Sequence, residues 1–148
     1  MQSIALIFIV IGIRRIYNAY KAEYYENIND GEFPTSEVIR DMLINQELIG
    51  FSFFIFSTLI ISYVNYKNKV SIINTIIVFL IVLLLFLLGF FDNGILHGVI
   101  NSYCYFFTDD IGFMFLIGGV MLIAAGVVIL WKTNKVIKKE LITKTHII

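Results

Sequence analysis

The sequence predicts an all-α integral membrane protein with four transmembrane helices, and three observations lead to this class. The 148 residues are 59% hydrophobic, with a mean hydropathy of +0.87, which lies outside the range of soluble globular proteins. The run 70–91 holds 22 residues without a charge. At about 1.5 Å per residue, a helix of that length matches a hydrocarbon core about 30 Å thick. Three further helical stretches surround this run, and together the four form a single domain over 1–148.

The first span is expected at about 2–20. The apolar run 3–13 has the length of a signal-peptide core, but no basic residue precedes it and no small-residue cleavage site follows it, so we expect it to remain in the mature protein. Apolar residues then keep helical spacing as far as Ile28, which predicts one helix from Gln2 to Asn29. Arg14 and Arg15 are expected to snorkel to the interface from this span.

The second span is expected at 48–65, after an amphipathic start. Asp30 and Gly31 are typical of a helix end. Pro34 followed by Thr35 and Ser36 is typical of a helix start, with either hydroxyl residue as N-cap. The segment 21–47 is therefore predicted to form an extramembrane helical hairpin, whose helices project about 15 Å from the bilayer at about 1.5 Å per residue.

The third and fourth spans are expected at 70–91 and 111–131. Between them, apolar residues recur at helical spacing in a segment without lysine or arginine, which predicts a short interfacial helix over 94–107. The basic tail 132–148 follows the interfacial Trp131, and its apolar residues are spaced to continue a helix along the membrane surface. The tail is expected to contact anionic headgroups through lysines, above all Lys132, Lys135, Lys138 and Lys139.

Charge is segregated between the two sides that these spans define. The side with both termini and the turn at 65–69 has seven Lys and Arg residues and one acid, whereas the other side has four basic residues and ten acids. The positive-inside rule counts the basic residues, and it favours an inner or plasma membrane protein with both termini in the cytoplasm. If residues 2–13 lie on the membrane instead of crossing it, three spans remain and this assignment changes.

Small residues form a stripe on the last span. Gly112, Gly119 and Gly126 repeat every seven residues, and Gly118 and Ala125 form a second pair one position earlier. Small residues let helices approach closely in lipid, so the stripe predicts a helix-packing face. Its partner is another helix of this chain, a second copy or another subunit, and a glycine-lined pore is a further alternative.

The candidate polar site lies in the segment between the third and fourth spans. A histidine near an acid can relay protons, sense pH or bind a metal, although a helix boundary and a hydrogen-bonded histidine explain the same residues. Cys104 is the only cysteine and is expected to be an apolar filler, and two potential ligands do not complete a metal site, so we expect neither a metal nor a cofactor. The candidates are Asp92, His97, Asn101, Asp109 and Asp110.

Three functional hypotheses follow. The first is a non-enzymatic membrane protein that acts by assembly, as a homo-oligomer or as an accessory subunit of a membrane complex, a class that includes immunity and defence proteins. The second is an oligomeric ion channel or transporter, with the acidic 92–110 segments at its mouth. The third is a membrane redox or metal protein that uses His97. The expected partners are the bilayer and other membrane subunits, and the lack of a basic cluster in the hairpin argues against nucleic acid.

Overall fold

The computed structural model is all-helical and describes residues 1–21 and 35–145. Within these ranges, the side chains of Asp92 and of 138–145 are not described. The all-α prediction is confirmed. Three of the described helices, α1, α3 and α6, are long and apolar enough to cross a membrane, whereas the apolar α4 has only 16 residues. The elements are α1 (Gln2–Tyr20), α3 (Ser36–Lys67), α4 (Ile72–Leu87), the 3₁₀ turn η1 (Phe90–Asp92), α5 (Gly94–Cys104) and α6 (Ile111–Thr145).

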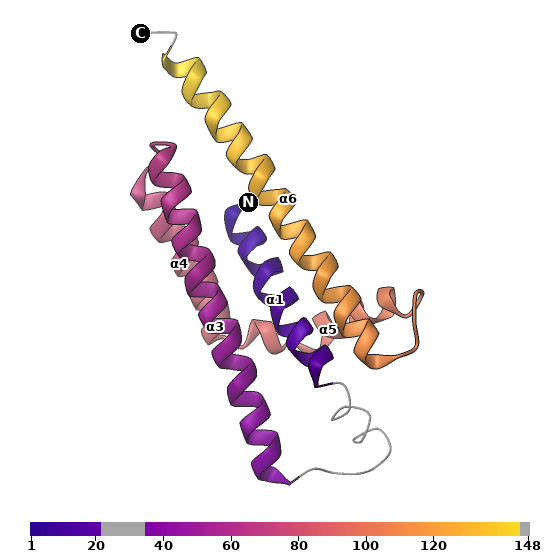
Figure 1. Ribbon diagram of the computed structural model, residues 1–148. Helices are drawn as coiled ribbons and strands as arrows, with labels where there is room; N and C mark the ends of the chain where they lie inside the picture. Colours follow the sequence, from indigo (N-terminus) through magenta and orange to yellow (C-terminus); the bar gives the residue numbers. More distant parts are fainter. Residues whose placement is uncertain (22–34, 146–148) are drawn as a thin grey trace.

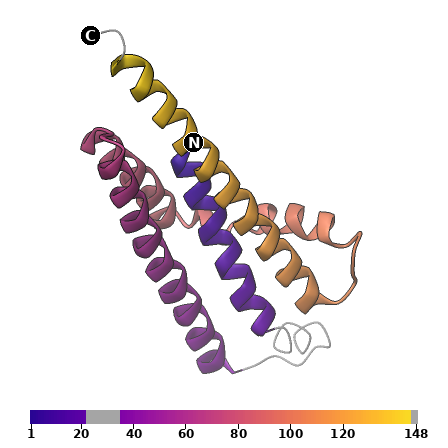
Figure 2. The same ribbon diagram turned by 45° about the horizontal axis from the view of Figure 1, so that its top comes forward.

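Helix α1 is the central element of the fold. It lies between α3 and α6 (Figures 1 and 2) and contacts α3, α4 and α6. Half of its apolar window is buried, against 22% for α3 and 17% for α6. Helix α5 runs across the bundle near the C-terminal end of α1 (Figure 1). The least apolar of the long helices is therefore the one that the others cover.

Capping residues set the ends of the shorter helices and correct the predicted boundaries. The third helix was expected over 70–91, but α4 begins after Ser71, whose hydroxyl accepts a hydrogen bond from the backbone N–H of Ile73. It ends before Gly89, which adopts the left-handed conformation at φ 67° that glycine permits at helix ends. Asn93 then caps α5 by accepting bonds from Ile95 and Leu96, and α5 ends at Cys104 instead of 107.

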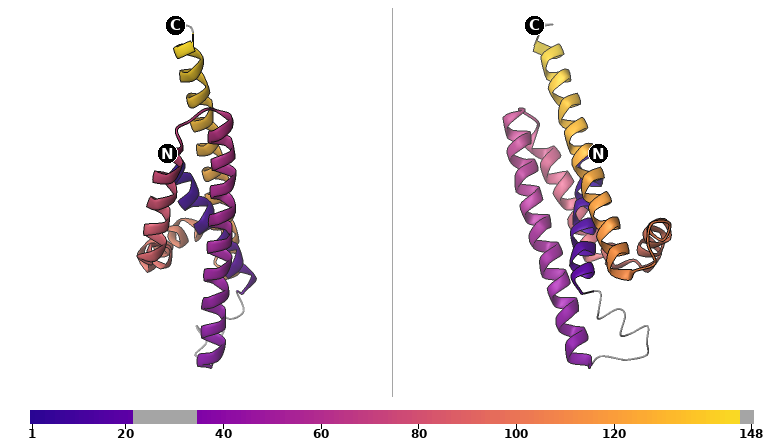
Figure 3. Two further views of the ribbon diagram at one scale, coloured as in Figure 1. Left: turned by 90° about the vertical axis from the view of Figure 1, so that its left-hand side faces the viewer. Right: turned by 45° about the vertical axis from the view of Figure 1, so that its right-hand side comes forward.

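The two longest helices run without a break through the predicted ends of their spans. Helix α3 begins at Ser36, as the sequence predicts, and Thr35 holds the N-cap position, although its side chain accepts no capping bond from the described residues. Helix α6 continues to Thr145 and extends beyond the N-terminus of α1 (Figure 3). The tail is therefore helical, but it continues in line with the span, whereas a helix along the membrane surface was expected. The expected helix end at Asp30 and Gly31 lies outside the described residues.

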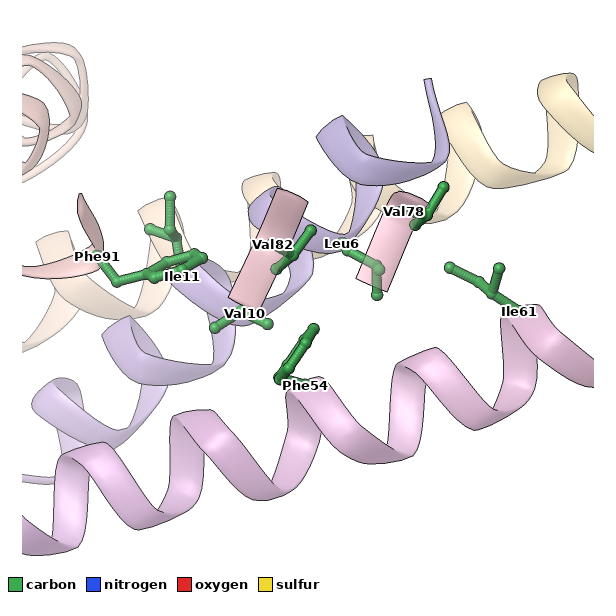
Figure 4. Close-up of a cluster of buried hydrophobic side chains, with 8 residues drawn as sticks. All are labelled: Leu6, Val10, Ile11, Phe54, Ile61, Val78, Val82 and Phe91. Carbon is green, nitrogen blue, oxygen red and sulfur yellow. The ribbon is translucent and has the colours of Figure 1, made fainter. Parts of the chain in front are cut away.

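The apolar core joins α1, α3 and α4. Phe54 of α3 is fully buried and stacks on Phe79 of α4 with ring centroids 5.3 Å apart. Phe91 of η1 closes the cluster at the end nearer α5, beside Ile11 (Figure 4). The buried members are Leu6, Val10, Ile11, Phe54, Ile61, Val78, Val82 and Phe91.

A cluster of amide side chains ties the N-terminus to the turn between α3 and α4. Gln2 and Asn65 exchange two hydrogen bonds, of 2.7 and 3.2 Å, and both residues are buried. Asn74 donates to Gln2 at 3.2 Å, and Asn65 donates to the Thr75 hydroxyl at 2.9 Å. The start of α1 and the α3–α4 turn therefore lie at the same end of the bundle.

Candidate functional site

Two adjacent arginines of α1 are the largest fully buried side chains among the described residues. Arg14 is 1% exposed and Arg15 is 0% exposed. Because successive residues of a helix point in different directions, the two guanidinium groups face different neighbours. Arg14 reaches α3, whereas Arg15 reaches α5 and α6. The expectation that both snorkel to the surface does not describe these buried positions.

Arg14 forms an ion pair with α3. Its Nη2 lies 2.9 Å from Glu47 Oε1, and the Glu47 side chain is 43% exposed. The arginine stem crosses Gly50, where an added Cβ would lie 2.9 Å from Arg14 Cδ. Glycine at position 50 therefore leaves the room through which a buried arginine reaches a carboxylate at the edge of the bundle.

Arg15 binds three uncharged acceptors. Its Nη2 donates to Asn101 Oδ1 at 2.6 Å and to the backbone carbonyl of Met114 at 3.1 Å. Its Nη1 lies 3.4 Å from His97 Nδ1, and its guanidinium carbon lies 5.0 Å from the centre of the Phe115 ring. One charged side chain of α1 thereby joins α5 to the first turns of α6.

The hydrogen bonds of His97 indicate which ring nitrogen carries the proton. Nε2 lies 2.9 Å from the carbonyl oxygen of Phe91, which can only accept, so Nε2 is the donor. Nδ1 then presents its lone pair to the guanidinium of Arg15.

A glycine of the predicted stripe makes room for this guanidinium. A Cβ added at Gly118 would lie 2.7 Å from Arg15 Nε, 2.8 Å from Nη2 and 3.0 Å from Cγ2 of Ile100. Those distances are far below van der Waals contact, and the guanidinium is fixed by its hydrogen bonds. Glycine at position 118 is therefore required by Arg15 and not by a neighbouring backbone.

The other members of the stripe lie against or beside α1. A Cβ at Gly119 would lie 2.7 Å from the carbonyl oxygen of Gly12, and a Cβ at Gly12 would lie 2.7 Å from that of Gly119. A Cβ at Gly126 would lie 2.8 Å from the carbonyl oxygen of Ala5. Gly112 lines a cleft of about 410 Å³ beside the last turn of α1, and Ala125 is half-buried. The helix that packs on this face is thus α1 of the same chain.

The remaining predicted residues whose side chains are described are not gathered into one site. Asp110 caps α6 by accepting a 2.8 Å hydrogen bond from the N–H of Phe113, whereas Asp109 is exposed. Asp92 belongs to η1, and its side chain lies outside the description. Of the tail lysines, Lys132 is exposed, Lys135 lies 4.7 Å from the ring of Trp131, and the side chains of Lys138 and Lys139 are not described. Of the polar candidates whose side chains are described, His97 and Asn101 meet at Arg15.

Arg15 was not predicted to be the centre of this site. His97 and Asn101 were among the candidates, but they were grouped with Asp92 and not with a residue more than 80 positions earlier. The available signal was an arginine pair inside an apolar helix, because such residues face the interior and need partners. In the described part of the chain, no three His, Cys, Asp or Glu residues could together hold a metal ion.

The arginines, the glycines that admit them and the acceptors that hold them define the site. It can hold charge inside the bundle and lock helices together. No protein-family model, no curated protein and no solved structure matches this chain.

Proposed function

We propose that the protein is an integral membrane protein without enzymatic activity that acts by assembly, as a homo-oligomer or as an accessory subunit of a membrane complex. The observation that supports its place in a membrane is the inverted distribution of side chains. Large apolar residues of α3, α4 and α6 are exposed, whereas the charged or amide side chains of Gln2, Arg14, Arg15 and Asn65 are buried. Exposed apolar surface of this extent is unfavourable in water and suits lipid.

Four crossings are part of this proposal. Helices α1, α3 and α6 have the required length, and α4 spans about 24 Å at about 1.5 Å per residue. That is shorter than a hydrocarbon core of about 30 Å, a mismatch that local thinning of the bilayer accommodates. The hydrogen bonds between Gln2 and Asn65 support placing the N-terminus and the α3–α4 turn on one side. The excess of basic residues favours the cytoplasm for that side.

Assembly is supported by the first three turns of α3. This stalk, residues 36–46, precedes the Arg14–Glu47 ion pair, and its start extends past the C-terminal end of α1 (Figure 1). Four of its apolar side chains, Val38, Ile39, Leu43 and Ile44, are exposed. Because the stalk begins beyond the ends of the spans, lipid does not cover its apolar face, and a protein surface is the occupant that we propose.

The glycine stripe leaves the stalk as the better candidate for contact with another chain. Gly119 and Gly126 already pack so closely on α1 that an added Cβ would collide with its backbone. A second copy therefore cannot use the same face without separating α1 from α6. The alternative of a glycine-lined pore gains no support from this packing, because α1 fills that face of α6.

The test is native mass spectrometry of the protein in lipid nanodiscs, after expression beside its genomic neighbours. We expect a defined homo-oligomer or a second protein in fixed ratio, and the double variant Ile39→Ser with Leu43→Ser should lose that species. The matched control is Glu37→Gln with Arg40→Gln, which removes an exposed pair 3.8 Å apart on the same stalk but keeps its apolar side chains. A wild-type protein that is monomeric and free of other chains would overturn the proposal.

A further inference from the structure

A groove between α3 and α4 opens on the surface that the proposed function assigns to lipid. It encloses about 520 Å³, which lies within the range of about 300–1,000 Å³ for ligand sites. It follows α3 from Tyr66 down to Thr58, or about 12 Å at about 1.5 Å per residue. Its other lining residues are Ser62, Val70, Ile72, Thr75, Ile76 and Phe79.

Three of the four hydroxyl side chains that line this groove are engaged within the chain, and the fourth, Tyr66, is exposed at the end nearer the α3–α4 turn. Thr58 donates to the carbonyl of Phe54 at 2.8 Å, and Ser62 donates to the carbonyl of Thr58 at 2.7 Å. The Thr75 hydroxyl accepts from Asn65 at 2.9 Å. Since these groups are satisfied, the walls present mainly apolar surface to whatever enters, which suits a hydrocarbon chain better than a polar partner helix.

Two lysines lie at the end of the groove nearer the α3–α4 turn. Lys67 and Lys69 do not line the groove themselves, but they are exposed and fall in the chain between Tyr66 and Val70, which do. Nζ of Lys67 lies 5.0 Å from the centre of the Tyr63 ring, beside the groove, so the Lys67 side chain must turn to reach a headgroup at the mouth. The turn is fixed by a 2.9 Å hydrogen bond from the N–H of Val70 to the carbonyl of Asn65. Lys69 adopts a left-handed conformation at φ 52°, held by a 3.1 Å bond from its own N–H to the carbonyl of Tyr66.

We infer that this groove is a binding site for an anionic phospholipid, with an acyl chain between α3 and α4 and the phosphate beside Lys67 and Lys69. The inference rests on the proposed membrane location. Charge complementarity decides the class of lipid: two cations at the mouth of an apolar groove favour a phosphate without a compensating choline. Each lysine near an anionic headgroup contributes about fivefold to affinity, so the pair contributes about 25-fold.

The experiment is native mass spectrometry of delipidated protein titrated with phosphatidylglycerol or with phosphatidylcholine of the same chains. We expect wild-type protein to prefer phosphatidylglycerol, and Lys67→Gln with Lys69→Gln to lower that preference by about 25-fold. Lys132→Gln with Lys135→Gln, which removes two charges of α6 outside the groove, should lower it less. Ser62→Phe, which fills the groove, should weaken binding of both lipids.

Two outcomes would overturn the inference. One is equal affinity of the wild-type protein for the two lipids, and the other is an equal loss of preference in the two lysine double variants. The same spectra report the oligomeric state independently of bound lipid. A missing lipid site in an assembled protein is therefore distinguished from a failure of assembly.

Discussion

Replacing Gly119 by alanine should separate α1 from α6. The added Cβ would lie 2.7 Å from the carbonyl oxygen of Gly12 and 2.8 Å from Cγ1 of Ile16. Ordinary contact begins at 3.4 Å, so the backbone of one helix must move by about 0.7 Å. A backbone oxygen cannot rotate away as the end of a side chain can, and the shift is therefore transmitted to the whole α1–α6 pair.

The expected loss of stability follows from two opposing terms. Overpacking of a close interface costs about 1–3 kcal/mol. Alanine in place of glycine stabilises a helix by about 1 kcal/mol. Gly98→Ala is the matched control, because an added Cβ there meets no described atom within 4 Å, so only the second term applies. The two variants should differ by about 1–3 kcal/mol in the free energy of opening, because the helix term cancels.

Cys104 provides the assay. It is the only cysteine, it is 2% exposed, and it lies in α5 close enough to Arg15 for an electrostatic interaction. When opening is fast, its alkylation rate by a small maleimide reports the population of the open state. Gly119→Ala should react about 5- to 150-fold faster than Gly98→Ala. Equal rates in the two variants would refute the close α1–α6 packing.

Two further substitutions test the ends of α5 and α6. Asn101→Leu removes an acceptor of Arg15 and should destabilise the fold by about 1.5–3 kcal/mol, the value of a hydrogen bond to a charged group. Asn101→Asp keeps an acceptor and should not destabilise the fold. Equal unfolding temperatures of the two variants would contradict the role of Asn101 as an acceptor for Arg15. Asp110→Ala removes the cap at Phe113 and should cost about 0.5–2 kcal/mol, while Asp109→Ala should leave the unfolding temperature unchanged. A larger effect at Asp109 would show that the cap is assigned to the wrong aspartate.

The long helices could be predicted because each contains an apolar run that is long enough by itself. The start of α3 at Ser36 followed from local capping residues, and the end of α4 could have followed from Gly89, which the sequence analysis instead included in its span. A boundary set by one residue is predictable when that residue has a distinct backbone preference, as glycine has for the left-handed conformation that follows a helix.

The arginine site could not be predicted in the same way. Arg15 and Asn101 are 86 positions apart, and no sequence pattern around either residue predicts that the two side chains meet. The glycine repeat of α6 predicted a packing face, but the matching glycine on α1 is the single Gly12, which has no periodic pattern. Pairing of helices depends on their relative positions in space, and these were not available from the order of hydrophobic runs.

The measurement that tests the four-span arrangement most directly is the sidedness of single cysteines in cells. In a Cys104→Ser background, Asn68→Cys probes the α3–α4 turn and Asp109→Cys probes the loop before α6. A membrane-impermeant maleimide should label Asp109→Cys on intact cells, and Asn68→Cys only after permeabilisation. If both cysteines react from the same side, α4 does not cross the bilayer, and the four-span arrangement is contradicted.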